Sequence, residues 1–360
     1  MAQLAMNSRL LRCQNASTLG RTVGSYTQNR TYLSSAKVPS FDNAPKKIKS
    51  GLNKFRNEVF IPLNLSEQQK LLIYRKKHQG TLDEHPVTVA ISEEEEYRLQ
   101  PMEFTAQPRN SKANELIRRM KTEDDWKQLP AFLTALHNVN RKLNLEMVVR
   151  RAGMNDAMKF ILAAAQAKDT GFSLRSPGLV QKIFFELHLH AQKHGFKGPE
   201  VDRMLRLAQS FVDLMGLPRH VNNNPAKDPR RRPAVIGVLL ELSAARALDK
   251  FGGKDTDGLV RAYSERLLAS LNNKHFRLEM KKPNLYRNWT KIDGKLEQVV
   301  PIYNALVLTQ KTAIDATISK TMKDRAKTMR DWVHLMRNAA PNSVRKHPMR
   351  GLGNSRELCT

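Results

Sequence analysis

The sequence predicts a mainly α-helical fold of stacked antiparallel helical hairpins, similar to an α-solenoid, with a short β-hairpin near the N-terminus and extended basic arms. From Ser111 onward, apolar residues recur three and four positions apart in successive segments, a pattern that buries one stripe of each helix. Glycines follow several of these segments and precede short polar connections, as is typical of helix C-termini. The remaining observation is charge: 61 Lys and Arg stand against 34 Asp and Glu, a formal net charge of +27. A compact basic protein of this kind needs an anionic partner.

Residues 1–37 predict a mitochondrial transit peptide. This segment contains five basic residues and no Asp or Glu, and it is rich in hydroxyl and amide side chains. A helix would place Leu4, Met6, Leu10 and Leu11 near one side, and an amphipathic, acid-free leader is typical of import into mitochondria. An ordinary disordered N-terminus is the alternative. Removing the five charges from the total of +27 leaves +22 on the rest of the chain, so the body itself is strongly basic.

Residues 38–110 predict a basic arm, a short helix and a β-hairpin. Lys37 to Asn57 has no clear apolar period and is interpreted as an extended arm carrying Lys46, Lys47 and Lys49. Such arms are often solvated tails, but they can also become ordered on contact with RNA. Leu65 to His78 predicts a helix with Ser66 as its N-cap, because a Ser side chain can accept hydrogen bonds from the first turn. Its exit is a positive patch formed by Arg75, Lys76, Lys77 and His78.

Val87 to Ile91 and Tyr97 to Leu99 are short β-like runs that predict one hairpin. The acidic cluster Glu93 to Glu96 lies between them. Four carboxylates repel RNA, so this cluster is expected to face a protein partner, a basic patch or solvent, with a solvated turn as the simplest interpretation.

The body divides into a helical-hairpin block at 111–219, a loop with a second helical block at 220–272, and a basic loop, long C-terminal helix and tail at 273–360. Helices are predicted at Asn114–Met120, Glu123–Asn140, Leu145–Ala152, Asp156–Lys168, Gly178–His194, Pro199–Met215, Arg232–Lys250, Thr256–Asn272 and Val299–Met336. Gly171, Gly195 and Gly216 are expected to end three of them.

Two irregular stretches carry most of the candidate RNA contacts. His220 to Arg232 is rich in Asn and Pro, is expected to separate two helical blocks, and ends in Arg230, Arg231 and Arg232. Asn273 to Gly294 interleaves basic residues with Phe276, Tyr286 and Trp289, which suits phosphate neutralisation combined with base stacking, although ordinary loop packing fits equally well. Over residues 274–350 there are 17 basic and 6 acidic side chains, so positive charge concentrates near the C-terminus.

Several kinds of chemistry are excluded or unsupported. The two cysteines, Cys13 and Cys359, cannot form a disulfide framework or a cysteine-based metal site. Gly252-Gly253-Lys254 lacks the spacing of a phosphate-binding loop. His190 and His194 lie four residues apart with His188 nearby, but the sequence offers no third ligand, so they are interpreted as surface or groove histidines. No stretch is apolar and long enough for a transmembrane helix. No cofactor, metal or small-molecule substrate is predicted.

The transit-like leader, the basic arm, and hairpins ending in Thr170-Gly171-Phe172 and His194-Gly195-Phe196 resemble pentatricopeptide-like helical proteins of fungal mitochondria, including those recruited to the small ribosomal subunit. The resemblance covers residues 111–272. It implies a helical RNA-binding or ribosomal protein in the mitochondrial matrix. The uneven hairpin lengths depart from the family's period of about 35 residues, so no residues of a base-by-base RNA code can be carried over.

The leading hypothesis is a non-enzymatic mitochondrial ribosome component or RNA-binding protein, whose partners are mitochondrial rRNA or mRNA and ribosomal proteins. The alternative is a matrix-side scaffold or assembly factor for an inner-membrane respiratory complex, with peripheral membrane contact through anionic lipid. An enzyme with an unrecognised acid–base site is a third, weaker hypothesis. The residues predicted to contact RNA are Lys46, Lys47, Lys49, Arg75, Lys76, Lys77, Arg230, Arg231, Arg232, Lys281, Lys282, Arg287, Trp289, Lys323, Arg325, Lys327 and Arg330.

Overall fold

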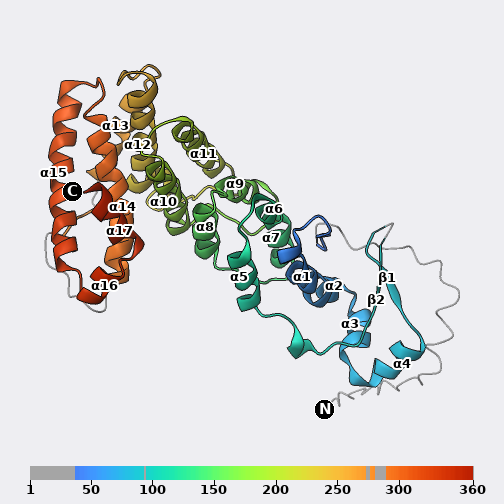
Figure 1. Cartoon of the computed structure of the whole chain (residues 1–360). Helices are drawn as coiled ribbons and strands as arrows, with labels where there is room; N and C mark the ends of the chain where they lie inside the picture. Colours follow the sequence, from blue (N-terminus) through green and yellow to red (C-terminus); the bar gives the residue numbers. More distant parts are fainter. Residues whose placement is uncertain (1–36, 93–94, 273–275, 280–288, 360) are drawn as a thin grey trace, which may run out of the picture. The chain divides into compact units, whose positions relative to one another are not determined.

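A computed structural model of the chain describes residues 37–92, 95–272, 276–279 and 289–359 (Figure 1). These residues are mainly helical, as the sequence predicts. They fall into two compact units, a small one at 65–102 and a large one made of 37–64 and 103–359. The predicted transit peptide at 1–37 lies outside the described residues except for Lys37.

The small unit contains the short helix and the β-hairpin that the sequence predicts. Helix α3 (Glu67–Tyr74) begins at Ser66, whose side chain accepts the Gln69 backbone N–H while the Gln69 side chain accepts the Ser66 N–H. This capping box satisfies two backbone donors that the first turn leaves unpaired. A 3₁₀ turn (Lys76–His78) and α4 (Gln79–Glu84) follow. Strands β1 (Thr88–Ala90) and β2 (Glu96–Arg98) then pair antiparallel, with Val89 opposite Tyr97.

The segment predicted as an extended arm is instead helical. Helix α1 (Lys46–Phe55) runs into a π-helical turn (Arg56–Phe60) and α2 (Ile61–Asn64). The prediction was wrong because Ile48, Leu52 and Phe55 recur four and three residues apart among the lysines and form a fully buried stripe. Phe55 packs edge-on against Phe132, with 5.5 Å between ring centroids, and so joins the main core.

The rest of the large unit is a succession of helices (Figure 1). Most coincide closely with the predicted segments, and α11 has the predicted bounds. The helices are α5 (Asn110–Arg119), α6 (Glu123–Lys127), α7 (Leu129–Asn138), α8 (Leu145–Met154), α9 (Met158–Gln166), α10 (Pro177–Lys193), α11 (Pro199–Met215), α12 (Pro233–Lys250), α13 (Leu259–Leu271), α14 (Trp289–Thr309), α15 (Ala316–Ala339), α16 (Asn342–Lys346) and α17 (Arg350–Leu358).

These helices pack as stacked hairpins. Several neighbours in sequence contact each other, among them α8 with α9, α10 with α11, and α12 with α13. Alternate helices do so too: α8, α10, α12 and α14 form one continuous row, and α7, α9 and α11 form another. Contacts between alternate helices are what stacking of antiparallel hairpins produces. The stack continues across residues 216–232, because α12 packs against both α10 and α11. The predicted loop is present there, but the helices on its two sides share one core.

Two of the predicted glycine caps have the left-handed conformation and one does not. Gly171 (φ 67°) and Gly195 (φ 62°) follow α9 and α10 in a conformation that strains residues bearing a Cβ. Gly216 ends α11 with φ −78°, a helical value. It therefore marks the helix end without the left-handed turn.

Helix α12 lies at the centre of the stack. Nearly all of its side chains are buried, and it contributes to both hydrophobic clusters of the large unit. Gly237 lets α14 approach closely, because a Cβ there would come 2.7 Å from the Ile302 side chain. In the part of the chain that the structure describes, no helix combines the length and apolar character that a membrane span requires.

The C-terminal region differs from the predicted single helix over Val299–Met336. Helix α14 ends at Thr309, and α15 begins at Ala316. The connection is held because the Ala313 N–H donates to the Gly253 carbonyl (2.8 Å) and the Asp315 side chain accepts the Thr317 N–H (2.8 Å) as an N-cap. Helix α14 also takes up 289–294, which the sequence assigned to an irregular stretch. The tail folds back, with α17 packed against α14.

Candidate nucleic-acid interface

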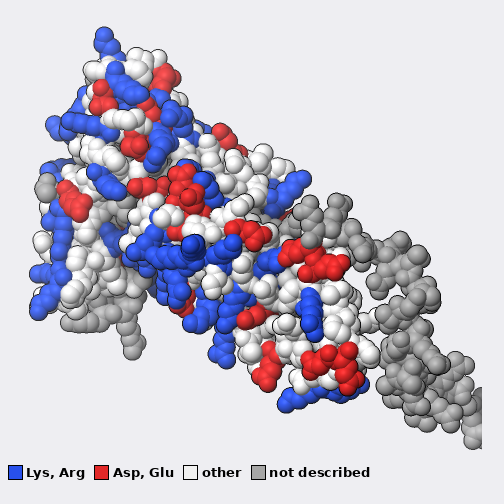
Figure 2. Space-filling model, turned by 45° about the vertical axis from the view of Figure 1, so that its right-hand side comes forward, with Lys and Arg blue, Asp and Glu red and all other residues white. Residues whose placement is uncertain are grey.

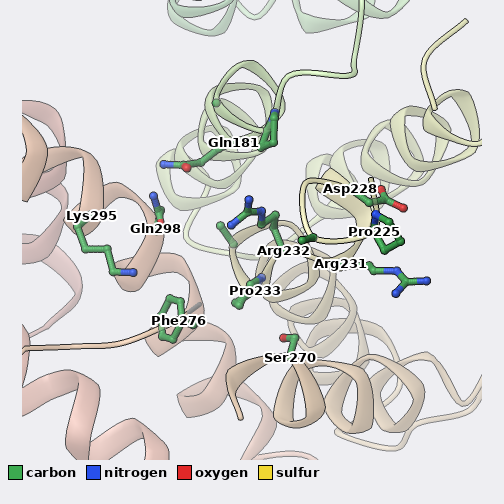
Figure 3. Close-up of a pocket in the computed structure, with 14 residues that line it drawn as sticks. Gln181, Pro225, Asp228, Arg231, Arg232, Pro233, Ser270, Phe276, Lys295 and Gln298 are labelled. Atoms are coloured by element: carbon green, nitrogen blue, oxygen red, sulfur yellow. The ribbon is translucent and has the colours of Figure 1, made fainter. Parts of the chain in front are cut away.

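A hollow of about 430 Å³ lies where α10 and α12 begin (Figure 3). Its walls come from four helices and two connections that are distant in sequence. They are Pro177, Gly178 and Gln181 of α10, Pro225, Ala226, Asp228, Arg231 and Arg232 before α12, Pro233 and Ala234 of α12, Ser270 of α13, Phe276, and Lys295 and Gln298 of α14. We call this hollow the cationic pocket.

The one carboxylate that lines the cationic pocket is already neutralised. Asp228 accepts the Arg230 backbone N–H (3.0 Å) and pairs with the Arg230 guanidinium, with 2.8 Å between Nη2 and Oδ2. Burial raises the pKa of the Asp228 carboxyl, but the hydrogen bonds and charge of Arg230 outweigh it and hold that pKa below its ordinary value. Arg230 is therefore engaged in structure, and Asp228 has little charge left for the other cations.

The pocket's remaining cations have no carboxylate. Arg231, Arg232 and Lys295 form no ion pair with any residue that the structure describes. The Arg232 Nε atom is buried and has no hydrogen-bond partner among the described residues. The Lys295 ammonium lies 4.1 Å from the centroid of the Phe276 ring, and burial, followed by the charge of Arg232, lowers the pKa of Lys295. Two adjacent desolvated cations repel each other until an anion binds between them.

Local structure adds to this positive field. Helices α10 and α12 begin at Pro177 and Pro233, and the N-terminus of a helix carries a partial positive charge with unpaired N–H groups. In Figure 3, Arg232 and Lys295 extend toward the interior of the pocket, whereas Arg231 points away from them. The arrangement suits one phosphate held by Arg232 and Lys295, with Phe276 supplying an apolar ring beside it.

A second basic hollow, of about 500 Å³, lies between α1 and α5. It brings the predicted residue Lys47 together with basic residues that sequence reasoning missed, namely Lys54, Arg109, Lys112 and Arg119. Its carboxylate, Glu115, pairs with Lys112 and Arg119, whose hydrogen bonds lower the pKa of Glu115. Surplus positive charge remains on Lys47 and Arg109.

Helix α15 presents a basic face. Lys323, Arg325, Lys327 and Arg330 are exposed, whereas Met322, Ala326 and Met329 on the other side are buried. The helical repeat explains this separation. Arg325 donates to the Asn272 side chain (2.6 Å), and Arg330 lies 3.7 Å from Asp331, so these two are partly engaged.

The other predicted contacts have mixed positions. Lys46 and Lys47 are exposed on α1, and Arg75, Lys76 and Lys77 are exposed in the small unit. Lys49 is half-buried and donates to the Asp42 carbonyl (2.8 Å). Lys281, Lys282 and Arg287 lie outside the described residues. On the face shown in Figure 2, Lys and Arg are spread over the helical stack with Asp and Glu interspersed, so the pockets are more informative than net charge.

Trp289 does not have the position that the prediction of base stacking requires. Its side chain is only 5% exposed and belongs to the hydrophobic cluster that α12, α13, α14 and α15 form together. The ring is therefore packed in the core at the start of α14 and is not free to stack on a base. Phe276, half-buried beside Lys295, is the aromatic residue that the structure places at the candidate interface.

One group of described side chains could hold a metal ion. Single ligand atoms of His190, His194 and Glu200 all lie within 4.8 Å of one another. Glu200 is the third ligand that the sequence did not reveal, because it lies on the helix after the two histidines.

Comparison with known proteins gives two matches. The family model described as mitochondrial ribosomal protein mS27 matches residues 25–357. The chain is also 28% identical over 231 residues to the small ribosomal subunit protein mS27 of Neurospora crassa. That alignment covers 59% of this chain and 58% of the relative, so it spans little more than half of that protein's length.

Proposed function

This chain belongs to the mitochondrial ribosomal protein mS27 family, and on that premise we propose that it is a non-enzymatic structural component of the mitochondrial ribosome. It acts in the matrix, where rRNA and other ribosomal proteins are its partners. The observation that carries this proposal is the family match over residues 25–357. The alternative of a scaffold for an inner-membrane respiratory complex is not favoured, since the relative is also a ribosomal protein.

The RNA contacts are proposed from the charge of the described surfaces. Arg232 and Lys295 in the cationic pocket bind one backbone phosphate, and this pocket is the main RNA contact of the large unit. The unpaired, partly buried state of these two cations supports this role, because a bound phosphate would neutralise them where water cannot fully do so. Exposed cations on α1, on α15 and in the small unit add weaker contacts that are screened by salt.

The helical hairpins from α7 to α12 are proposed to be of the pentatricopeptide-like kind. Packing between alternate helices supports this assignment. The connections differ in length: residues 194–198 join α10 to α11, whereas residues 216–232 join α11 to α12. This unevenness disfavours a regular code of one base per repeat. The stack is therefore proposed to act as a shaped, basic platform. Residues 1–37 are proposed to direct import.

The cationic pocket is tested by the double substitution Arg232→Gln/Lys295→Gln in the full chain. Affinity of the purified protein for mitochondrial small-subunit rRNA should fall at least about tenfold, since each hydrogen bond to a charged group contributes roughly 1.5–3 kcal/mol. The slope of log affinity against log salt should decrease by about 0.7, because one phosphate contact to single-stranded RNA is lost. Filter binding or fluorescence anisotropy at several salt concentrations measures both quantities.

The matched control is Lys168→Gln/Arg261→Gln, which removes the same charge from exposed positions outside the cationic pocket. If both double variants lose affinity equally, binding follows net charge and the pocket assignment is wrong.

The wider proposal is tested by sedimentation of lysed mitochondria. The protein should co-migrate with the small ribosomal subunit at moderate salt and shift after ribonuclease treatment, whereas pelleting with membranes irrespective of ribonuclease would refute it. Substitutions are preferable to truncation at 273, because α14 and α17 share a core with α12.

A further inference from the structure

The last turn of α10 and the first turn of α11 bring together two imidazoles and a carboxylate. His190 lies in the last turn of α10, and His194, four residues on, is the C-cap residue of that helix. Their ring centroids are 4.9 Å apart. Glu200 lies in the first turn of α11, after the short connection at 194–198, and its Oε2 lies 2.9 Å from His190 Nε2. The three ligand atoms lie within 4.8 Å of one another.

A fourth residue orients the central histidine. Asp156, on the connection between α8 and α9, lies 2.8 Å from His190 Nδ1 through its carboxylate. A carboxylate that accepts the Nδ1 proton leaves Nε2 available to face Glu200 and His194. His190 is only 6% exposed, so its ring is held by packing. Metal-binding histidines have this arrangement, with a carboxylate fixing the tautomer and the ring orientation.

Ion pairing alone explains part of this cluster. His190 lies between Asp156 and Glu200, and the Arg203 guanidinium lies 3.0 Å from Glu200 and 3.4 Å from His190 Nε2. His194 takes no part in that pairing: its ring is exposed, packs tilted beside His190, and forms no hydrogen bond with any residue in the described ranges. A second imidazole placed beside the first is a suitable second ligand for a metal ion.

The cluster is also accessible. A hollow of about 430 Å³ reaches His190 and Asp156 from the surface and is lined by Arg203. The Arg203 side chain is 51% exposed. It can therefore turn toward solvent when a cation binds, and the exposed position of His194 leaves the cluster open to water on that side.

We propose that His190, His194 and Glu200 bind one Zn²⁺ ion, with Asp156 as the positioning residue and water as the fourth ligand. Nitrogen and carboxylate donors suit Zn²⁺, and in a tetrahedral site with bonds of about 2.0–2.2 Å neighbouring ligand atoms lie about 3.3 Å apart. The separations here, from 2.9 Å to at most 4.8 Å, reach that value by side-chain rotation. Binding replaces any proton on His190 Nε2 and releases it to solvent. The ion joins the end of α10 to the start of α11 and stabilises that hairpin.

The test uses the purified full chain after treatment with a chelator. Calorimetric titration with Zn²⁺ should give one site per chain, and bound Co²⁺ should give the strong visible absorption of four-coordinate geometry. At about a hundredfold excess of free Zn²⁺ over its Kd, the Tm should rise by about 5 °C. His194→Ala and Glu200→Gln should each abolish the one-site titration and the rise in Tm, and Asp156→Asn should weaken binding about tenfold.

Two further variants should not weaken Zn²⁺ binding. Arg203→Gln removes a cation beside Glu200 and should tighten Zn²⁺ binding, whereas His347→Ala removes an exposed histidine on another part of the large unit and should change nothing. Absence of Zn²⁺ binding at micromolar concentrations overturns the proposal. So does binding that survives in both His194→Ala and Glu200→Gln, because the ion then lies elsewhere. RNA affinity measured on the same variants should be unchanged, so this result is independent of the ribosomal role.

Discussion

The two ends of α10 differ in how their charges are balanced. At its N-terminal end the cationic pocket contains Arg232 and Lys295 without a carboxylate partner among the described residues. At its C-terminal end, His190 is held between the carboxylates of Asp156 and Glu200. The helix and its surroundings are otherwise similar, with packing on α8 and α12. The comparison teaches that the kind of side chain gathered at each end, rather than the presence of charge, distinguishes the two proposed ligands: cationic donors for an anion at one end, and imidazole and carboxylate groups for a cation at the other.

Between these ends, buried polar groups pair with one another across helices, although Asn354 Oδ1 has no hydrogen-bond partner among the described residues. His188 lies 2.7 Å from Glu241, whose other oxygen accepts from the Asn304 amide (2.6 Å), and Asn354 lies 2.7 Å from the second His188 nitrogen. Glu186 forms a bidentate pair with Arg350. This network joins α10 to α12, α14 and α17. Since its partners are all protein groups, we expect its loss to affect folding and not binding.

The largest effect expected from this comparison is that of Arg350→Ala. Glu186 is 2% exposed, and burial raises its pKa while Arg350 opposes that shift. Removing Arg350 leaves a buried carboxylate without its cation, which should lower the free energy of unfolding by about 3 kcal/mol. Urea denaturation measures it. Arg356→Ala, an exposed arginine on the same helix, should change stability by less than about 0.5 kcal/mol. Equal effects of the two variants would mean that the Glu186–Arg350 pair does not stabilise the contact of α17 with α10.

A smaller effect is expected for Glu241→Gln, and it should depend on pH. Burial raises the pKa of Glu241 in spite of His188 and Asn304. A carboxyl with a raised folded-state pKa contributes stability that is present below the unfolded pKa of about 4.5 and is lost as pH rises through the folded pKa. The Gln variant should therefore gain stability relative to wild type between pH 4.5 and neutrality, by about 1.4 kcal/mol for each unit of pKa elevation. Denaturation at several pH values tests the sign, and a gain by wild type would show that protonated His188 stabilises the carboxylate.

The smallest effect is expected for Lys295→Met in the free protein. Burial and the charge of Arg232 lower the pKa of Lys295. The neutral form of Lys295 therefore contributes stability above the unfolded pKa, and this contribution is lost as pH falls through the folded pKa. At neutral pH the charge of Lys295 lowers the free energy of unfolding. Methionine should raise the free energy of unfolding by about 0.5 kcal/mol while weakening RNA binding. Lys291→Met, at an exposed position one turn earlier on α14, is the control. A loss of stability together with unchanged RNA affinity would show that Lys295 stabilises the fold and does not bind RNA.

The sequence predicted the helices well where the apolar pattern is local. Pro199–Met215 has the predicted bounds, and the Ser66 cap and the hairpin at 88–98 were also correct. Membership of the mS27 family confirms the prediction of a mitochondrial ribosomal protein. The errors share a cause. The stripe of Ile48, Leu52 and Phe55 was obscured by the lysines between them, and the break after Thr309 depends on a contact with Gly253 that is distant in sequence.

The candidate sites depended on distant contacts throughout. Arg232 was predicted as an RNA contact, but Lys295 was not, because only the packing of α14 against α12 places its ammonium beside that arginine. The same holds for Glu200, which becomes a third ligand only when α11 folds back along α10. Trp289 shows the reverse, since an aromatic residue among lysines became part of the core.

By itself, the sequence determined the helical class, the apolar face of most helices and the excess of positive charge, because these follow from residue type and from spacing within a few turns. Only the tertiary structure decided which charges are paired. Pairing depends on which side chains meet across helices and on how far packing removes them from water, and neither is encoded in local spacing. In this protein, that difference separates the cations that hold the fold together from those left free to bind a ligand.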